Sequence, residues 1–128
     1  MAHTVLIVDD SPTELHVLGE GLRKHGYEVL TAENGEDGLE LCRRHRPDAV
    51  LMDIVLPGIS GFEATRKITR DPETKGTPVI IVSGKNLDTD RLWGLRQGAV
   101  GYLAKPIDED HLVETIRECI DSREPAGA

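Results

Sequence analysis

Five short apolar runs alternate with longer segments of helical periodicity, and this alternation limits the fold more than any other feature of the chain. The runs are rich in Val, Ile and Leu: Thr4–Val8, Glu28–Ala32, Asp48–Met52, Pro78–Val82 and Val100–Ala104. Near-continuous aliphatic runs are typical of parallel strands that are buried on both faces. We therefore expect an α/β domain, a doubly wound five-stranded parallel sheet with helices on both faces.

The segments between the runs carry helix-start signals. Ser11–Glu14 and Ser60–Glu63 each have the pattern of a capping box, and Asn34 can cap a third helix that ends near Arg46. Two further helices are expected over Asp88–Gln97 and Asp108–Ser122. The apolar residues expected to face the core from these helices are Leu15, Leu18, Leu22, Leu39, Cys42, Leu92, Leu95, Leu112, Val113, Ile116, Cys119 and Ile120.

Length and charge narrow the class of protein. The 128 residues fit one domain, expected over residues 1–122, with 123–128 as a disordered tail. A net charge of −8 argues against direct binding of nucleic acid, which needs clustered Lys and Arg. We see no signal peptide and no apolar run of membrane-spanning length, so we expect a cytoplasmic protein. None of the five histidines shows metal-ligand spacing.

Polar side chains follow four of the five strands at their carboxyl ends. Asp9 and Asp10 follow the first strand, Asp53 the third, Ser83 the fourth and Lys105 the fifth. In a doubly wound sheet these ends meet at one edge, where ligands bind. Three carboxylates at one place repel each other unless a hard divalent cation offsets their charge. With a lysine and a hydroxyl beside them, the set has the parts that phosphoryl transfer to an aspartate requires.

Four sequence blocks, each at the end of an expected strand, resemble the response-regulator receiver (chemotaxis-regulator-like) family over essentially the whole chain. The blocks are Leu6–Ser11, Leu51–Gly61, Val79–Gly84 and Gly101–Pro106. The resemblance implies a flavodoxin-like fold with strand order 2-1-3-4-5. It also implies that Asp53 receives a phosphoryl group from a histidine kinase in a Mg²⁺-dependent reaction.

The resemblance gives each site residue a role. Mg²⁺ is expected on Asp10, Asp53 and the backbone carbonyl of Val55, and on Asp9 through water. Lys105 pairs with the phosphoryl oxygens and with the acid cluster.

Two further residues form the expected switch. Ser83 moves to the phosphoryl group and Tyr102 swings inward. A separate effector protein then reads the face formed by the fourth helix, fifth strand and fifth helix, with the chain acting as a monomer.

Some positions refine this picture. Ser83 stands where many family members have Thr, and Val55 and Lys85 occupy places that tune the lifetime of the phosphoryl group in the family. The Lys105–Pro106 bond is expected to be cis, as is usual in the family. Residues in the ranges Asp9–Glu14, Phe62–Arg66, Asp71–Thr74 and Thr89–Ala99 resemble the single-domain receivers of type IV pilus (twitching-motility) chemosensory systems.

The sequence also bears on three other functions. The chain could drain phosphoryl groups from a shared kinase instead of driving an effector. An aspartate-nucleophile phosphatase of the haloacid-dehalogenase type expects a second Asp two residues after the nucleophile, which neither Asp9–Ser11 nor Asp53–Val55 provides. A nucleotide- or flavin-binding domain would need a glycine-rich phosphate loop, which the sequence lacks. We therefore expect no enzyme activity beyond phosphoryl acceptance and slow self-dephosphorylation.

Overall fold

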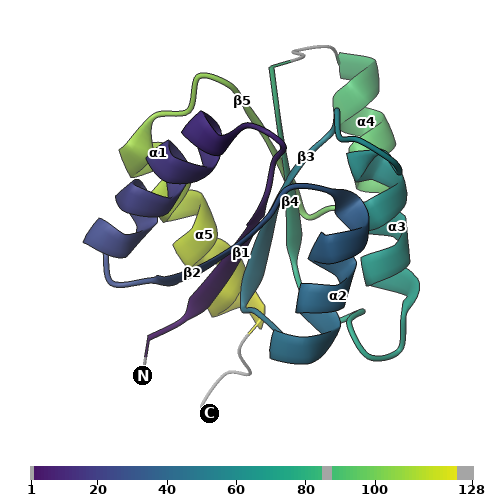
Figure 1. Ribbon diagram of the computed structural model, residues 1–128, viewed down its shortest axis with the longest axis horizontal. Coiled ribbons are helices and arrows are strands. Elements are labelled where there is room, and N and C mark those ends of the chain that lie inside the picture. The colour runs from purple at the N-terminus through teal and green to yellow at the C-terminus, as the bar shows by residue number, and fades with distance from the viewer. Residues whose placement is uncertain (1, 85–87, 124–128) are drawn as a thin grey trace.

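Five parallel strands form the centre of the molecule in the order β2-β1-β3-β4-β5, as the computed structural model shows (Figure 1). The structure describes residues 2–84 and 88–123. The strands are β1 (Thr4–Val8), β2 (Glu28–Ala32), β3 (Ala49–Asp53), β4 (Val79–Ser83) and β5 (Gly101–Ala104). The helices are α1 (Pro12–Lys24), α2 (Gly35–His45), α3 (Gly61–Arg70), α4 (Asp88–Arg96) and α5 (Glu109–Arg123). The fold class and the strand order predicted from the sequence are confirmed.

The helices cover the two faces of the sheet in two groups. Helices α1 and α5 lie on one face, and α2, α3 and α4 lie on the other (Figure 1). Each face has its own aliphatic core, because alternate residues of every strand point to opposite sides. Leu22 and Ile116 belong to the first core, while Cys42 and Ile68 belong to the second. Both faces of the central strands are thus buried, which explains their continuous apolar sequence.

The predicted helix caps are present at all three positions. The Ser11 hydroxyl accepts a hydrogen bond from the Glu14 N–H at 3.3 Å, and the Asn34 side chain accepts one from the Asp37 N–H at 2.7 Å. The Ser60 hydroxyl accepts one from the Glu63 N–H at 3.2 Å. Each cap satisfies an N–H group that has no partner within its helix. These three helices begin next to the carboxyl ends of the strands because each follows a strand directly along the chain.

Helix α4 contradicts the expected core. Leu92 and Leu95 were expected to face inward, but they are 54% and 45% exposed. The fully buried residue of α4 is Gly94, where a Cβ atom would meet Ile81 Cγ1 at 3.2 Å. A residue without a side chain therefore makes the close contact with the sheet, and the leucines are turned outward.

The remaining expectations have mixed outcomes. Cys42 is buried and Cys119 is half-buried, each on a helix as predicted, and burial raises the pKa of the Cys42 thiol to about 12. The Lys105–Pro106 bond is cis. Arg123 was assigned to the tail but is the last residue of α5, and 124–128 lie outside the described residues. Among the described helices, none has the length and apolar character that crossing a bilayer requires.

Candidate functional site

The polar strand-end residues meet at one edge of the sheet, as the sequence predicted. Strand register sets their level: Val8 lies opposite Met52, Asp53 opposite Val82 and Ser83 opposite Ala104. The positions that follow β1 and β5 therefore lie at the same edge as the ends of β3 and β4.

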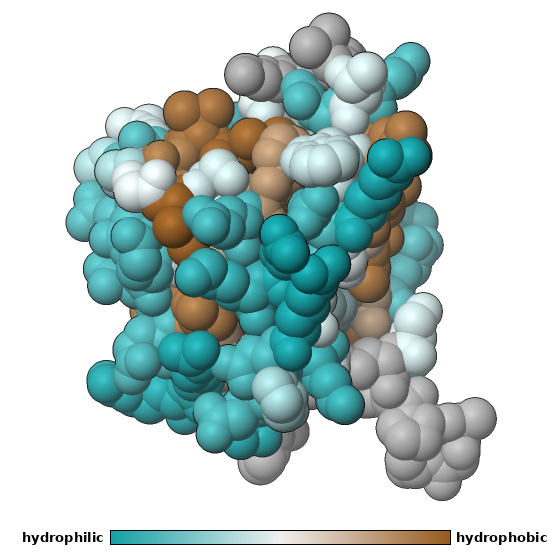
Figure 2. All heavy atoms as spheres, turned by 90° about the vertical axis from the view of Figure 1, so that its right-hand side faces the viewer, coloured by the Kyte–Doolittle hydropathy of each residue, from teal (hydrophilic) through white to brown (hydrophobic). Residues whose placement is uncertain are grey.

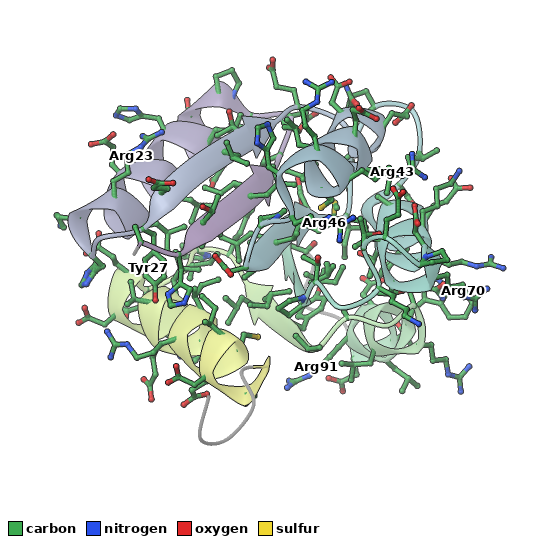
Figure 3. The ribbon with its side chains drawn as sticks, turned by 90° about the horizontal axis from the view of Figure 1, so that it is seen from below. Arg23, Tyr27, Arg43, Arg46, Arg70 and Arg91 are labelled. Carbon is green, nitrogen blue, oxygen red and sulfur yellow. The ribbon has the colours of Figure 1, made fainter. Side chains whose placement is uncertain are left out.

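The opposite end of the sheet carries a different set of charges. Arg23, Arg46 and Arg70 lie there, where the helices end (Figure 3). These arginines are therefore remote from Asp9 and Asp53, and Lys105 supplies the positive charge close to those two carboxylates.

Three carboxylates form a cluster at the site edge. Asp9, Asp10 and Asp53 each offer one oxygen, and these oxygens lie within 4.8 Å of one another. Asp9 is 2% exposed, whereas Asp10 is open to solvent. The Ser11 N–H donates to Asp9 Oδ1 at 2.9 Å and holds that side chain in place. An all-oxygen set with several negative charges fits a hard divalent cation such as Mg²⁺.

Lys105 reaches into this cluster from the end of β5. Its ammonium donates to Asp9 Oδ2 at 2.8 Å and lies 3.8 Å from Asp53 Oδ2. Burial acts to lower the pKa of Lys105. The hydrogen bond to Asp9 and the charges of Asp53, Asp9 and Glu14 outweigh it, so the pKa is raised. Lys105 therefore stays charged and supplies a fixed positive charge between two of the acids.

Asp53, at the end of β3, has a carboxyl group with a raised pKa. Its side chain is 12% exposed, and this burial is the largest cause of a pKa raised from 3.8 to about 6. The charges of Asp9 and Asp10 raise the pKa further, while Lys105 and the Ile54 N–H lower it. The Ile54 N–H donates to Asp53 Oδ1 at 2.9 Å. Asp53 is thus a largely buried carboxylate, and a bound cation would offset its negative charge.

The expected switch residues lie on the neighbouring strands. Ser83 ends β4 with 1% exposure, and its backbone carbonyl accepts a hydrogen bond from the Lys105 N–H at 2.8 Å. Tyr102 on β5 is partly buried against the core beneath α2 and α3. Val55, just beyond Asp53, is 60% exposed. Lys85 lies outside the described residues.

The structure adds one residue to the site that the sequence did not single out for it. Gly61 was placed at a helix start and at the end of the block Leu51–Gly61 with no role in the site, but it packs against the backbone of Asp53. Its position directly after the Ser60 cap was the available signal, because a glycine at the first turn of a helix suggests close approach of another chain segment.

A second group of possible metal ligands lies away from the strand ends. His25, Glu109 and Asp110 also offer ligand atoms within 4.8 Å of one another, a grouping in space that spacing along the sequence does not reveal. The Lys24 ammonium lies 3.3 Å from Glu109 Oε2 and competes with a cation there. We interpret this group as a surface ion-pair cluster that ties α1 to α5.

The fold and the site together define a class: a doubly wound α/β domain with an acidic, lysine-containing pocket at the carboxyl edge of its sheet. The chain belongs to the response regulator receiver domain family, whose model matches residues 5–117. The family resemblance predicted from the sequence is therefore confirmed. Receiver domains of two-component systems take phosphoryl groups from histidine kinases, bind Mg²⁺ in an acidic pocket and act on effectors.

Individual relatives agree with this assignment. The chain is 59% identical over 112 residues to Protein PilH of Pseudomonas aeruginosa, covering 88% of this chain and 93% of PilH. A response regulator structure from Chloroflexus aurantiacus superposes with a TM-score of 0.91 at 35% identity, covering 94% of this chain and 99% of that one.

A further similar structure contains a metal. The receiver domain of a Pseudomonas aeruginosa sensor histidine kinase has a TM-score of 0.88 at 32% identity, covering 94% of this chain and 99% of that one. That structure has a magnesium ion coordinated in its active-site cleft.

Proposed function

We propose that this chain is a phosphoacceptor switch that receives a phosphoryl group on Asp53 from a partner histidine kinase. The observation that carries the proposal is the position of Lys105. Its ammonium lies between Asp9 and Asp53, 2.8 Å and 3.8 Å from their nearer oxygens. A fixed cation at a buried carboxylate is the arrangement that stabilises charge during phosphoryl transfer.

The proposed reaction moves one phosphoryl group between two side chains. A carboxylate oxygen of Asp53 attacks the phosphorus of a phosphohistidine, so an O–P bond forms while the P–N bond breaks. The imidazole of the kinase leaves with the bonding electron pair. Lys105 offsets the charge on the phosphoryl oxygens, and the Ser83 hydroxyl donates to one of them. Catalysis here consists of positioning and charge stabilisation rather than proton transfer.

The acid cluster fits a resident Mg²⁺ ion. Asp10, Asp53 and the Val55 carbonyl would hold the ion directly, and Asp9 would hold it through water. When bound, the ion supplies positive charge that neutralises the phosphoryl oxygens. The chain's own part is to orient Asp53, through the Ile54 N–H and Lys105, and to shield it largely from water.

We infer that the signal leaves through the face formed by α4, β5 and α5. Phosphorylation replaces the single negative charge of the Asp53 carboxylate by a phosphoryl group that carries about −1.5 to −2 charges. Movement of Ser83 and Tyr102 would transmit this change to α4. Leu92, Trp93 and Leu95 of this helix are exposed to solvent. Figure 2 looks onto the side of α3 and α4 and shows hydrophobic side chains exposed among hydrophilic ones. Exposed apolar side chains of this kind favour a separate effector protein as the reader.

The similarity to PilH supports a role in a type IV pilus chemosensory (twitching-motility) pathway. In this proposal the receiver, over residues 1–122, acts as a cytoplasmic monomer. The expected partners are proteins and not nucleic acid, in line with the net charge of −8.

The chemical form of the product tests this proposal. An acyl phosphate on Asp53 reacts with hydroxylamine to give a hydroxamate, which peptide mapping by mass spectrometry can locate. After treatment with acetyl phosphate and Mg²⁺, we expect the hydroxamate on the peptide that contains Asp53. A stable phosphate on Ser83, or a hydroxamate on Asp9 or Asp10, would contradict the proposal.

A further inference from the structure

Gly61, the first residue of α3, is packed directly against the peptide that joins Asp53 to Ile54. Its N–H donates to the Ile54 carbonyl at 2.8 Å. A Cβ atom at this position would overlap the Asp53 carbonyl oxygen, and it would lie 2.7 Å from the Asp53 carbonyl carbon and 2.9 Å from Ile54 Cα. These are backbone atoms, which cannot rotate away as a flexible side chain can. Any side chain at position 61 must therefore displace the Asp53–Ile54 peptide.

The same peptide sets the direction of the Asp53 carboxylate. It carries the Ile54 N–H, which donates to Asp53 Oδ1 at 2.9 Å. The other carboxylate oxygen, Oδ2, faces Lys105 at 3.8 Å. A tilt of the peptide would turn the N–H donor, and with it the oxygen that faces the lysine.

The first turn of α3 holds Gly61 in place from the other side. The hydroxyl of Thr65, which is fully buried, donates to the Gly61 carbonyl at 2.7 Å. The Ser60 hydroxyl caps the same turn. The contact between Gly61 and the Asp53 backbone is thus fixed by hydrogen bonds on both sides and not by loose packing.

We propose that Gly61 is a positioning residue for phosphoryl acceptance. The absence of a side chain lets the start of α3 hold the Asp53–Ile54 peptide so that one Asp53 oxygen is fixed and the other faces Lys105. The inference rests on the proposed function of Asp53 as the acceptor. Small errors in the orientation of a reacting group cost large factors in rate.

The test compares Gly61→Ala with the wild type in two measurements. The rate of phosphorylation by acetyl phosphate at saturating Mg²⁺ is followed by intact mass. We expect the maximal rate to fall about tenfold or more, because the acceptor is misdirected. The amide proton of Ile54, observed by NMR, should shift as its hydrogen bond to Asp53 changes.

A matched control separates positioning from stability. Gly98→Ala also introduces strain, because Gly98 has φ of +105° and a Cβ there would meet Thr69 Oγ1 at 2.6 Å. Gly98 precedes β5, at the end of the sheet opposite to the site. Gly98→Ala should lower the melting temperature and keep the wild-type rate and the Ile54 shift. If Gly61→Ala behaves in the same way, the inference is wrong.

A second pair of variants covers the case in which Gly61→Ala does not fold. Thr65→Val removes the hydroxyl that anchors Gly61, and Thr65→Ser keeps it. The inference predicts that Thr65→Val slows phosphorylation and shifts the Ile54 amide, and that Thr65→Ser restores both. Equal rates and shifts in the two variants would overturn it. If the wild type accepts no phosphoryl group, the proposed function fails, while the Ile54 shift still decides whether Gly61 orients Asp53.

Discussion

Lys105 and Asp9 form a 2.8 Å ion pair between the ends of β5 and β1, two strands that are not neighbours in the sheet. The Asp9 side chain is 3% exposed and the Lys105 side chain 19%. The pair should therefore stabilise the fold in addition to its place in the site, because burial of a carboxylate without a partner is costly.

Replacement of Lys105 should reveal this stabilisation. We expect Lys105→Met to lower the free energy of unfolding by about 1–3 kcal/mol in the absence of Mg²⁺, because buried Asp9 loses the donor to its Oδ2 and keeps only the Ser11 N–H. Urea unfolding in EDTA measures the effect. Lys24→Met is the matched control, since its ion pair with Glu109 is exposed and should contribute less to stability. Equal losses in the two variants would show that Asp9 does not depend on Lys105.

The raised pKa of Asp53 predicts how stability depends on pH. The pKa of about 6 in the fold lies above the ordinary value of 3.8, so the folded chain keeps this proton where the unfolded chain has lost it. The contribution of Asp53 to stability therefore falls as the pH rises from 3.8 to about 6, and it stays constant above that value.

Asp53→Asn removes this titration. Without Mg²⁺, we expect the variant to be more stable than the wild type above about pH 6, with a gain that shrinks as the pH falls towards 3.8. Thermal melts over that range measure the difference. A gain that does not change with pH would mean that the burial of Asp53 carries no penalty on its charge.

Magnesium should relieve the repulsion within the acid cluster. A ligand that binds only the folded state stabilises it by about 1.4 kcal/mol at ten times its dissociation constant. We expect millimolar Mg²⁺ to raise the melting temperature of the wild type and to have a smaller effect on Asp10→Asn. Asp110→Asn serves as the control, because Asp110 belongs to the surface cluster with His25. An equal response of all three proteins would count against the site at the strand ends.

The outward orientation of α4 makes a prediction about stability alone. Leu92 is 54% exposed, so Leu92→Ser should change the free energy of unfolding by no more than about 0.5 kcal/mol. Leu112 on α5 is 2% exposed, and Leu112→Ser should cost several times as much. Denaturant unfolding of both variants checks the comparison. A large loss in Leu92→Ser would restore the expectation that α4 packs through its leucines.

The sequence predicted the strands and caps well because their signals are local. A continuous aliphatic run such as that before Asp53 has one reasonable place in an α/β fold, and a Ser or Asn cap acts within its own first turn. The meeting of Asp9, Asp53 and Lys105 also followed, since parallel strands share one carboxyl edge.

Helix α4 could not be predicted in the same way. Its leucines were assigned to the core because a surface helix usually packs its apolar residues against the core. The helix instead approaches the sheet through Gly94, a contact that periodicity does not reveal. The contact of Gly61 with the Asp53 backbone was missed for a related reason. Its place after the Ser60 cap indicates a close approach, but the sequence does not show which segment approaches.

The most direct test of the central claim is the intact mass of the protein after incubation with acetyl phosphate. The measurement is made with and without Mg²⁺, on the wild type and on Asp53→Asn. The account predicts the gain of one phosphoryl group that requires Mg²⁺ and is absent in Asp53→Asn. No gain in the wild type, or the same gain in Asp53→Asn, would contradict the assignment of Asp53 as the acceptor.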